Sequence, residues 1–247
     1  MTTVYVYRTH LWNNFCKSQY EKLQYDLGHE CVFLLFDDTS HPFPLEDYNR
    51  LSKPTNKASH NILTNFSECL LVNPLHRSNK EQVESQILLF HKLCPINFEF
   101  MWLIEYDVFC DGNWKLLDSC LSMNHDFLAT QVYVYHEKIL WNYWFALYGP
   151  RRKKPLLQDR ASGFFPLVRL SKKLIDCLQE NIGHYSGFCE VYIPTLAKQK
   201  GLTIGNVPLE IIGDIFYYEP LKKNEIKIDI KNNDKLYHPV TSLDVLN

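Results

Sequence analysis

Two carboxylates directly follow an apolar run in the segment WLIEYDVFCDGNW, residues 102–114. Residues i and i+2 of a strand point to the same side, so Glu105 and Asp107 would share one face at the carboxyl end of a buried strand. Open parallel sheets bind their ligands at that edge. Two carboxylate oxygens suit Mg²⁺ or Mn²⁺, which often bridge a protein to phosphates. A solvated strand end is the alternative, and the apolar run before the acids favours the metal site.

The segments around these acids must build the sheet that positions them. Apolar segments typical of strands alternate along the chain with segments whose apolar residues have helical spacing. This order predicts a mostly parallel sheet buried on both faces. Strands are predicted at 2–10, 30–39, 68–74, 98–109 and 127–136, and helices at about 12–27, 79–94, 165–183 and from near Glu190 onward. The remaining C-terminal tail is polar.

Composition limits the classes of protein that this chain can belong to. Its 247 residues are 46% hydrophobic and 22% charged, which suits one large α/β domain or two small ones. A net charge of -2 gives no reason to expect nucleic-acid binding. The eight cysteines form no Cys-x-x-Cys pair, which favours reduced thiols in a cytoplasmic protein. The start of the chain lacks the pattern of a signal peptide, and no apolar run approaches the ~20 residues of a membrane span.

Three segments together resemble the metal-dependent GT-A glycosyltransferases. Residues 102–114 resemble their D-x-D-type motif, in the W-E-x-D form seen in some polysaccharide-synthesis families. The segment GFCEVYIPTLAKQKG, 187–201, resembles the acidic segment that supplies the catalytic base of inverting members, and LYHPV, 236–240, resembles a C-terminal segment with a metal-binding histidine. Two departures are that Glu105 stands in place of Asp and that Cys189 stands where many relatives carry a second acid.

The resemblance implies one GT-A-like α/β domain over residues 1–247. It has a Rossmann-like, mostly parallel central sheet flanked by helices. Residues 1–115 would form the nucleotide-sugar-binding half, and residues 116–247 a less regular acceptor half with the C-terminal tail. No Walker loop, G-x-G-x-x-G or H-E-x-x-H motif is present, which argues against NTPases, dinucleotide oxidoreductases and zincins.

The same resemblance implies roles for individual side chains. Asp107, Glu105 and His238 would bind Mn²⁺ or Mg²⁺, and Glu190 would be the general base. The alternatives are a surface histidine in a loose tail for His238, and a charge that favours the first turn of a helix for Glu190.

Other candidate residues would contact the substrates. Arg8, Asp37 and Asp38 end the first two predicted strands, where they either bind the donor or simply meet water. Donor contacts are also predicted for Arg160, Ser162 and Gly163, and acceptor contacts for Trp141 and Trp144. The basic run RRKK, 151–154, is either a solvated charge run or a contact with a membrane surface or a lipid diphosphate.

The predicted function is an inverting transfer of a hexose from a nucleotide-diphosphate sugar to a hydroxyl of a glycan or lipid-linked glycan. The expected donor contains UDP as its nucleotide and galactose, in pyranose or furanose form, as its hexose. The product would belong to a surface polysaccharide, such as the O-antigen of lipopolysaccharide, made at the inner face of the membrane beside other polysaccharide-synthesis enzymes. The alternatives are a nucleotidyltransferase or other nucleotide-sugar enzyme, which needs no Glu190 base, and a non-catalytic glycan-binding domain.

Overall fold

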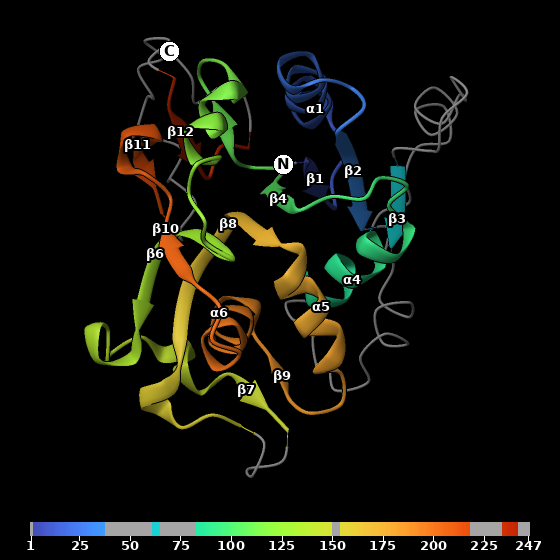
Figure 1. Cartoon of the computed structure of the whole chain (residues 1–247). Coiled ribbons are helices and arrows are strands. Elements are labelled where there is room, and N and C mark those ends of the chain that lie inside the picture. The colour runs from blue at the N-terminus through green and yellow to red at the C-terminus, as the bar shows by residue number, and fades with distance from the viewer. Residues whose placement is uncertain (1, 38–60, 65–82, 150–153, 218–233, 242–247) are drawn as a thin grey trace.

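The computed structural model describes residues 2–37, 61–64, 83–149, 154–217 and 234–241 (Figure 1). Its helices are α1 (Asn14–Leu27), α4 (Val83–Leu93), α5 (Lys172–Glu180) and α6 (Cys189–Gln199). Its strands are β1 (Thr3–Thr9), β2 (Val32–Asp37), β3 (Asn61–Thr64), β4 (Phe100–Glu105), β5 (Phe109–Cys110), β6 (Phe127–Val134), β7 (Leu147–Tyr148), β8 (Ala161–Ser171), β9 (Ser186–Gly187), β10 (Ile204–Asn206), β11 (Ile212–Phe216) and β12 (Leu236–His238). The strand predicted at 68–74 lies outside the described residues.

A seven-stranded sheet in the order β10-β6-β8-β4-β1-β2-β3 forms the centre of the molecule. β8 runs antiparallel to both of its neighbours, β4 and β6, and the other pairs in the sheet are parallel. The predicted α/β class with a mostly parallel central sheet is therefore confirmed. Strands from both halves of the chain belong to this one sheet.

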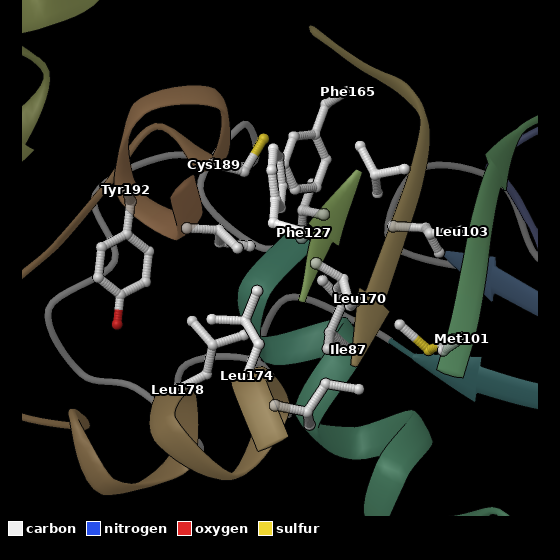
Figure 2. Packing of buried hydrophobic residues seen from close by; sticks show 14 of the residues in the cluster. Ile87, Met101, Leu103, Phe127, Phe165, Leu170, Leu174, Leu178, Cys189 and Tyr192 are labelled. Atoms are coloured by element: carbon white, nitrogen blue, oxygen red, sulfur yellow. The ribbon is translucent and has the colours of Figure 1, made fainter. Parts of the chain in front are cut away.

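The two faces of the sheet are buried by different elements. Successive residues of a strand point to opposite faces, so Met101 and Leu103 of β4 join the core under α4, α5 and α6. Trp102 and Ile104 of the same strand join a second core, with α1 and the small sheet β11-β12-β5. Figure 2 shows the first core. Within the described residues, no helix is long and apolar enough to cross a membrane.

The helix predicted at 165–183 is wrong over its first part. Residues up to Ser171 belong to β8, which is buried along its whole length, and α5 begins only at Lys172. An apolar run fits a doubly buried strand as well as a helix, so the local pattern alone did not separate them. The Ser171 side chain accepts a hydrogen bond from the backbone N–H of Leu174 and caps α5. This N-cap serine was the signal that could have placed the boundary.

Arg169 is the residue most affected by that correction. It lies on β8 and not in a helix, and it is fully buried. Its guanidinium donates to backbone carbonyls of the 120–125 segment and lies 4.4 Å from the centre of the Phe100 ring. Arg169 therefore holds the connection between β5 and β6 against the sheet.

Candidate metal centre

A turn and a distant strand, rather than strand alternation, bring the acidic pair together with an imidazole. β4 ends at Glu105, and Asp107 lies in the turn that follows, closed by a 3.0 Å bond from the N–H of Val108 to the carbonyl of Glu105. The expectation that both acids lie on one strand is therefore wrong. β12 pairs antiparallel with β5, just beyond this turn, and the N–H of Val240 bonds the Asp107 carbonyl at 2.8 Å. His238 of β12 thereby reaches the acids.

The side chains of these three residues converge. One ligand atom from each of Glu105, Asp107 and His238 lies within 4.8 Å of the other two. Nδ1 of His238 is 2.7 Å from the carbonyl oxygen of Tyr217, which can only accept, so Nδ1 carries the proton. Nε2 of the neutral ring then keeps its lone pair, 3.4 Å from Oδ1 of Asp107. His238 is buried in β12, so the structure does not support the alternative of a surface histidine in a loose tail.

The Asp107 carboxylate is the part of the cluster that most needs a cation. Among the described residues, its Oδ1 is buried and has no hydrogen-bond partner. Burying an unpaired polar atom is costly, and more so for a charged group. A divalent cation would remove that cost, and two carboxylates with one neutral imidazole form a ligand set that suits Mn²⁺ better than Mg²⁺. The residues present thus fit a bound divalent cation.

A polar chain continues from the cluster along the edge of the sheet. Arg8 lies opposite Glu105 in the β1–β4 register, and its Nη1 contacts Oε1 of Glu105 at 2.8 Å. Nε of Arg8 donates to Oε1 of Gln86 at 2.6 Å, and Nε2 of Gln86 donates to Oδ2 of Asp37 at 3.1 Å. Two predicted donor-binding residues, Arg8 and Asp37, therefore join one network at the carboxyl ends of β1 and β2.

Gln86 is a site residue that the sequence reading missed. It lies in the first turns of α4 and is almost completely buried. The signal was present, because Glu84, Ser85 and Gln86 are three consecutive polar residues directly before the apolar run 87–90 of the helix. Consecutive buried polar residues need partners, and those of Gln86 are the side chains at the strand ends.

The electrostatic balance of the cluster depends on Arg8. Burial raises the pKa of Glu105 above its ordinary value, the positive charge of Arg8 opposes the rise, and the negative charge of Asp107 adds to it. The two carboxylates repel each other, and the Arg8 guanidinium contacts Glu105. Further positive charge at this point would stabilise both.

Glu190 lies in the first turn of α6, close to this network. Its Oε1 accepts a 3.3 Å hydrogen bond from the N–H of Phe165, and the residue is buried. Burial raises the pKa of the neighbouring Cys189 thiol well above its ordinary value, Glu190 and then Glu105 add to the rise, and Arg8 opposes it. The start of α6 is therefore within electrostatic range of the metal cluster. The base role stays a prediction, and a carboxylate that favours the helix N-terminus also fits this position.

The remaining predicted substrate contacts lie in well-packed surroundings. Arg160 is buried and donates to the backbone carbonyls of Pro155 and Trp144. Trp144 is fully buried, donates from Nε1 to the Lys138 carbonyl at 2.7 Å and packs edge-on against Trp141.

Ser162 and Gly163 of β8 are closely packed as well. A Cβ at Gly163 would come within 2.7 Å of the Phe127 ring, and the buried Ser162 hydroxyl faces the Tyr133 carbonyl at 3.5 Å. Their substrate roles stay predictions. Asp38 and the basic residues 151–153 lie outside the described residues.

Comparison with known proteins finds similarity in structure only. No family model matches the chain, and no curated protein matches its sequence. A galactosyltransferase, LgtC, in complex with donor and acceptor sugar analogs, is 7% identical, covers 84% of this chain and 74% of its own, and has a TM-score of 0.46.

Two further solved structures are similar at the same level. A mannosyltransferase from Pyrobaculum calidifontis, in complex with GDP-Man and Mn²⁺, is 8% identical, covers 84% of this chain and 55% of its own, and has a TM-score of 0.45. A cytidylyltransferase from Leptospira borgpetersenii is 10% identical, covers 84% of this chain and 76% of its own, and has a TM-score of 0.41. Glycosyltransferases and a nucleotidyltransferase are thus both among the structures that this chain is similar to.

Proposed function

We propose that the chain is a metal-dependent, inverting glycosyltransferase, which moves a hexose from a nucleotide-diphosphate sugar to a hydroxyl of a glycan acceptor. One observation carries the proposal. Glu105, Asp107 and His238 converge at the carboxyl end of a mostly parallel sheet, with a buried carboxylate oxygen that has no hydrogen-bond partner among the described residues. Open α/β sheets bind their ligands at that edge.

Each residue of the cluster has a distinct part in this proposal. Asp107 and His238 would hold the cation, and Glu105 would complete its shell directly or through water. A bound divalent cation supplies Lewis-acid stabilisation of the negative charge that develops on the departing diphosphate. Arg8 holds the Glu105 carboxylate in place through their 2.8 Å contact, and Gln86 holds Arg8.

Glu190 is proposed to take the proton of the acceptor hydroxyl. A hydroxyl is a poor nucleophile until its proton is removed, and a positioned carboxylate contributes about 10²–10⁴-fold to the rate. The sugar carbon would pass through an oxocarbenium-like state, by analogy with glycoside hydrolysis. A single base-assisted displacement inverts the anomeric configuration.

The finer parts of the proposal concern the substrates. We propose UDP as the nucleotide, galactose as the hexose, and a lipid-linked glycan of a surface polysaccharide as the acceptor. The acidic strand-end network at Asp37 and Gln86 supports a contact with the uncharged hydroxyl or base groups of a nucleoside, because ribose and uracil offer donors to it.

Ligand binding tests the proposal first. A ligand that binds only the native state raises its stability by RT ln(1 + [L]/Kd), about 2.7 kcal/mol at 100 Kd. Thermal unfolding with UDP, GDP, CDP and ADP, each with Mn²⁺ or with EDTA, should show a metal-dependent rise for one nucleotide. If no nucleotide stabilises the protein in the presence of Mn²⁺ or Mg²⁺, the proposed donor site is wrong.

Glu190→Gln then tests the reaction. Metal-dependent nucleotide binding should persist, while transfer should fall by about 10²–10⁴-fold. Glu180→Gln is the matched control, because Glu180 ends α5 on the surface. NMR of the product should show inversion at the anomeric carbon. Retained configuration would remove Glu190 as the base, and release of pyrophosphate from a nucleoside triphosphate and a sugar phosphate would indicate a nucleotidyltransferase instead.

A further inference from the structure

A small cavity lies at one edge of the sheet, where β6, β10 and β11 approach one another. Its volume is about 150 Å³, and its ten lining residues include Thr130 and Gln131 of β6, Asn206 of β10 and Phe216 of β11. An engineered protein cavity of roughly this volume holds a benzene molecule. The space is therefore comparable in size to one six-membered ring.

Two residues that line the cavity, Phe216 and Tyr217, also contact His238 of the metal cluster. Tyr217 lines the cavity, and its carbonyl oxygen accepts the 2.7 Å hydrogen bond from Nδ1 of His238. The Phe216 ring, also part of the lining, lies 5.5 Å from the His238 ring, centre to centre. The opposite ring nitrogen of His238 faces Asp107. A ligand in the cavity would thus lie on the Nδ1 side of the imidazole, with the proposed metal on its Nε2 side.

The backbone of β6 is irregular where it forms the cavity wall. Gln131 has a backbone φ of 55°, in the left-handed region that residues other than glycine rarely adopt. Its side-chain Nε2 donates a hydrogen bond to the Phe216 carbonyl at 3.2 Å. The β6–β8 register shifts on both sides of Thr130, and the Thr130 hydroxyl is buried without a partner among the described residues. Bulges and strained residues concentrate beside functional sites, where they redirect side chains.

The chemistry of the lining selects the class of ligand. Leu209 and Phe216 provide apolar surface, while Gln131, Asn206 and Asp214 provide hydrogen-bonding groups. None of the residues that line the cavity in the described structure is basic, and Asp214 would repel a phosphate or a carboxylate. A neutral sugar ring matches this combination, because it has an apolar C–H face and a rim of hydroxyls. Mostly apolar walls with a few polar groups are typical of small-molecule sites.

We propose that this cavity binds one neutral sugar ring of the acceptor. The proposal rests on the function proposed above, and it assigns the acceptor to the β6–β10–β11 edge of the sheet, beside His238. Trp141 and Trp144 are then not the acceptor platform, in agreement with the complete burial of Trp144.

The test uses amide spectra of the ¹⁵N-labelled full chain during titration with three neutral probes: methyl β-D-galactopyranoside, methyl α-D-glucopyranoside and methyl α-D-mannopyranoside. At least one glycoside should shift the amides of Gln131, Gly213 and Phe216 in a saturable way. Leu209→Trp, which fills the mouth of the cavity from an exposed position, should weaken binding by at least about tenfold, a loss of ~1.4 kcal/mol. Leu140→Trp is the matched control, because Leu140 is exposed and does not line the cavity.

The two proposals can fail separately. Asp107→Ala should abolish metal-dependent nucleotide binding but leave the glycoside shifts in place. If nucleotide binds and none of the three glycosides perturbs the cavity amides up to its solubility limit, the acceptor assignment is overturned while the proposed donor site stands. Shifts that persist unchanged in Leu209→Trp also overturn it. Glycoside binding without any nucleotide binding would keep the sugar site and reject the transferase.

Discussion

The metal cluster and the environment of Glu84 show two ways in which this protein places carboxylates away from solvent, and both are connected to the first turn of α4. Glu84 is completely buried near the start of α4. Its Oε2 accepts from the Ser186 hydroxyl at 3.2 Å and its Oε1 from the Tyr192 hydroxyl at 3.1 Å. Two residues further along, Gln86 belongs to the chain of contacts that ends at the metal cluster.

The difference between the two groups lies in their donors. Each Glu84 oxygen has a neutral hydroxyl donor, and Asn181 in turn donates to the Tyr192 hydroxyl at 3.0 Å. In the cluster, Asp107 keeps a buried oxygen without a hydrogen bond among the described residues, and it faces the lone pair of His238. A satisfied buried network contributes to a unique fold, whereas a buried carboxylate oxygen that has no hydrogen-bond donor is suited to a cation. Four substitutions test this contrast.

Asp107→Ala should have the largest effect, on function alone. Metal-dependent nucleotide binding and transfer should both be lost, because a central ligand is removed. The melting temperature without ligand should not fall by more than a few degrees, since the substitution also removes a buried unpaired oxygen. Thermal unfolding with and without Mn²⁺ and nucleotide measures both. Asp118→Ala, at an exposed position, is the control, and full activity in folded Asp107→Ala protein would rule out the metal assignment.

His238→Ala should weaken Mn²⁺ binding by at least the 10–100-fold that follows loss of a supporting contact to a metal ligand. The affinity for Mg²⁺ should change less, because Mg²⁺ depends less on nitrogen ligands. Calorimetric titration of both ions gives the two ratios. Equal losses for the two ions would mean that His238 only supports the fold of β12, and unchanged affinities would remove it from the site.

Glu84→Ala should show the opposite behaviour, a large effect on stability alone. The Ser186 and Tyr192 hydroxyls would lose their acceptor in the core, so the free energy of unfolding should fall by about 2–4 kcal/mol. Urea unfolding at neutral pH measures this loss. Mn²⁺ affinity of the folded fraction should equal that of the unmodified protein. If Glu84→Ala keeps its stability but loses Mn²⁺ binding, Glu84 belongs to the metal site and the contrast with the metal cluster is wrong.

Asp126→Asn should have the smallest effect, and its size should depend on pH. Burial opposes ionisation of Asp126, but hydrogen bonds from Thr203 and Ser171 outweigh it and lower the pKa. A lowered native pKa means that the stabilisation is present above the unfolded value of ~3.9 and is lost as the pH falls through the native value. The variant should therefore lose about 1 kcal/mol at pH 7 and less below pH ~3.9. A difference that grows on acidification contradicts this assignment.

Much of the fold follows from local patterns in the sequence. Periodic apolar residues and Gly28 predict α1, and continuous apolar runs predict β1, β2 and β4, because burial on two faces selects such runs. The segment around β8 and α5 was not resolved in the same way, since its apolar residues satisfy both periods. Residues 161–171 form a strand because they pair with β4 and β6, whose residues are distant in the chain.

The candidate site, like the fold, was predictable from the sequence only in part. The ligand types could be predicted from the sequence: two acids follow an apolar run, and the resemblance adds a histidine and Glu190. Three features of the site came from the fold instead: Asp107 lies in a turn, β12 pairs with β5 and brings His238 beside Asp107, and Gln86 links Arg8 to Asp37. The physical reason is that side-chain chemistry is a property of each residue, whereas convergence depends on backbone hydrogen bonds between segments that no local pattern connects.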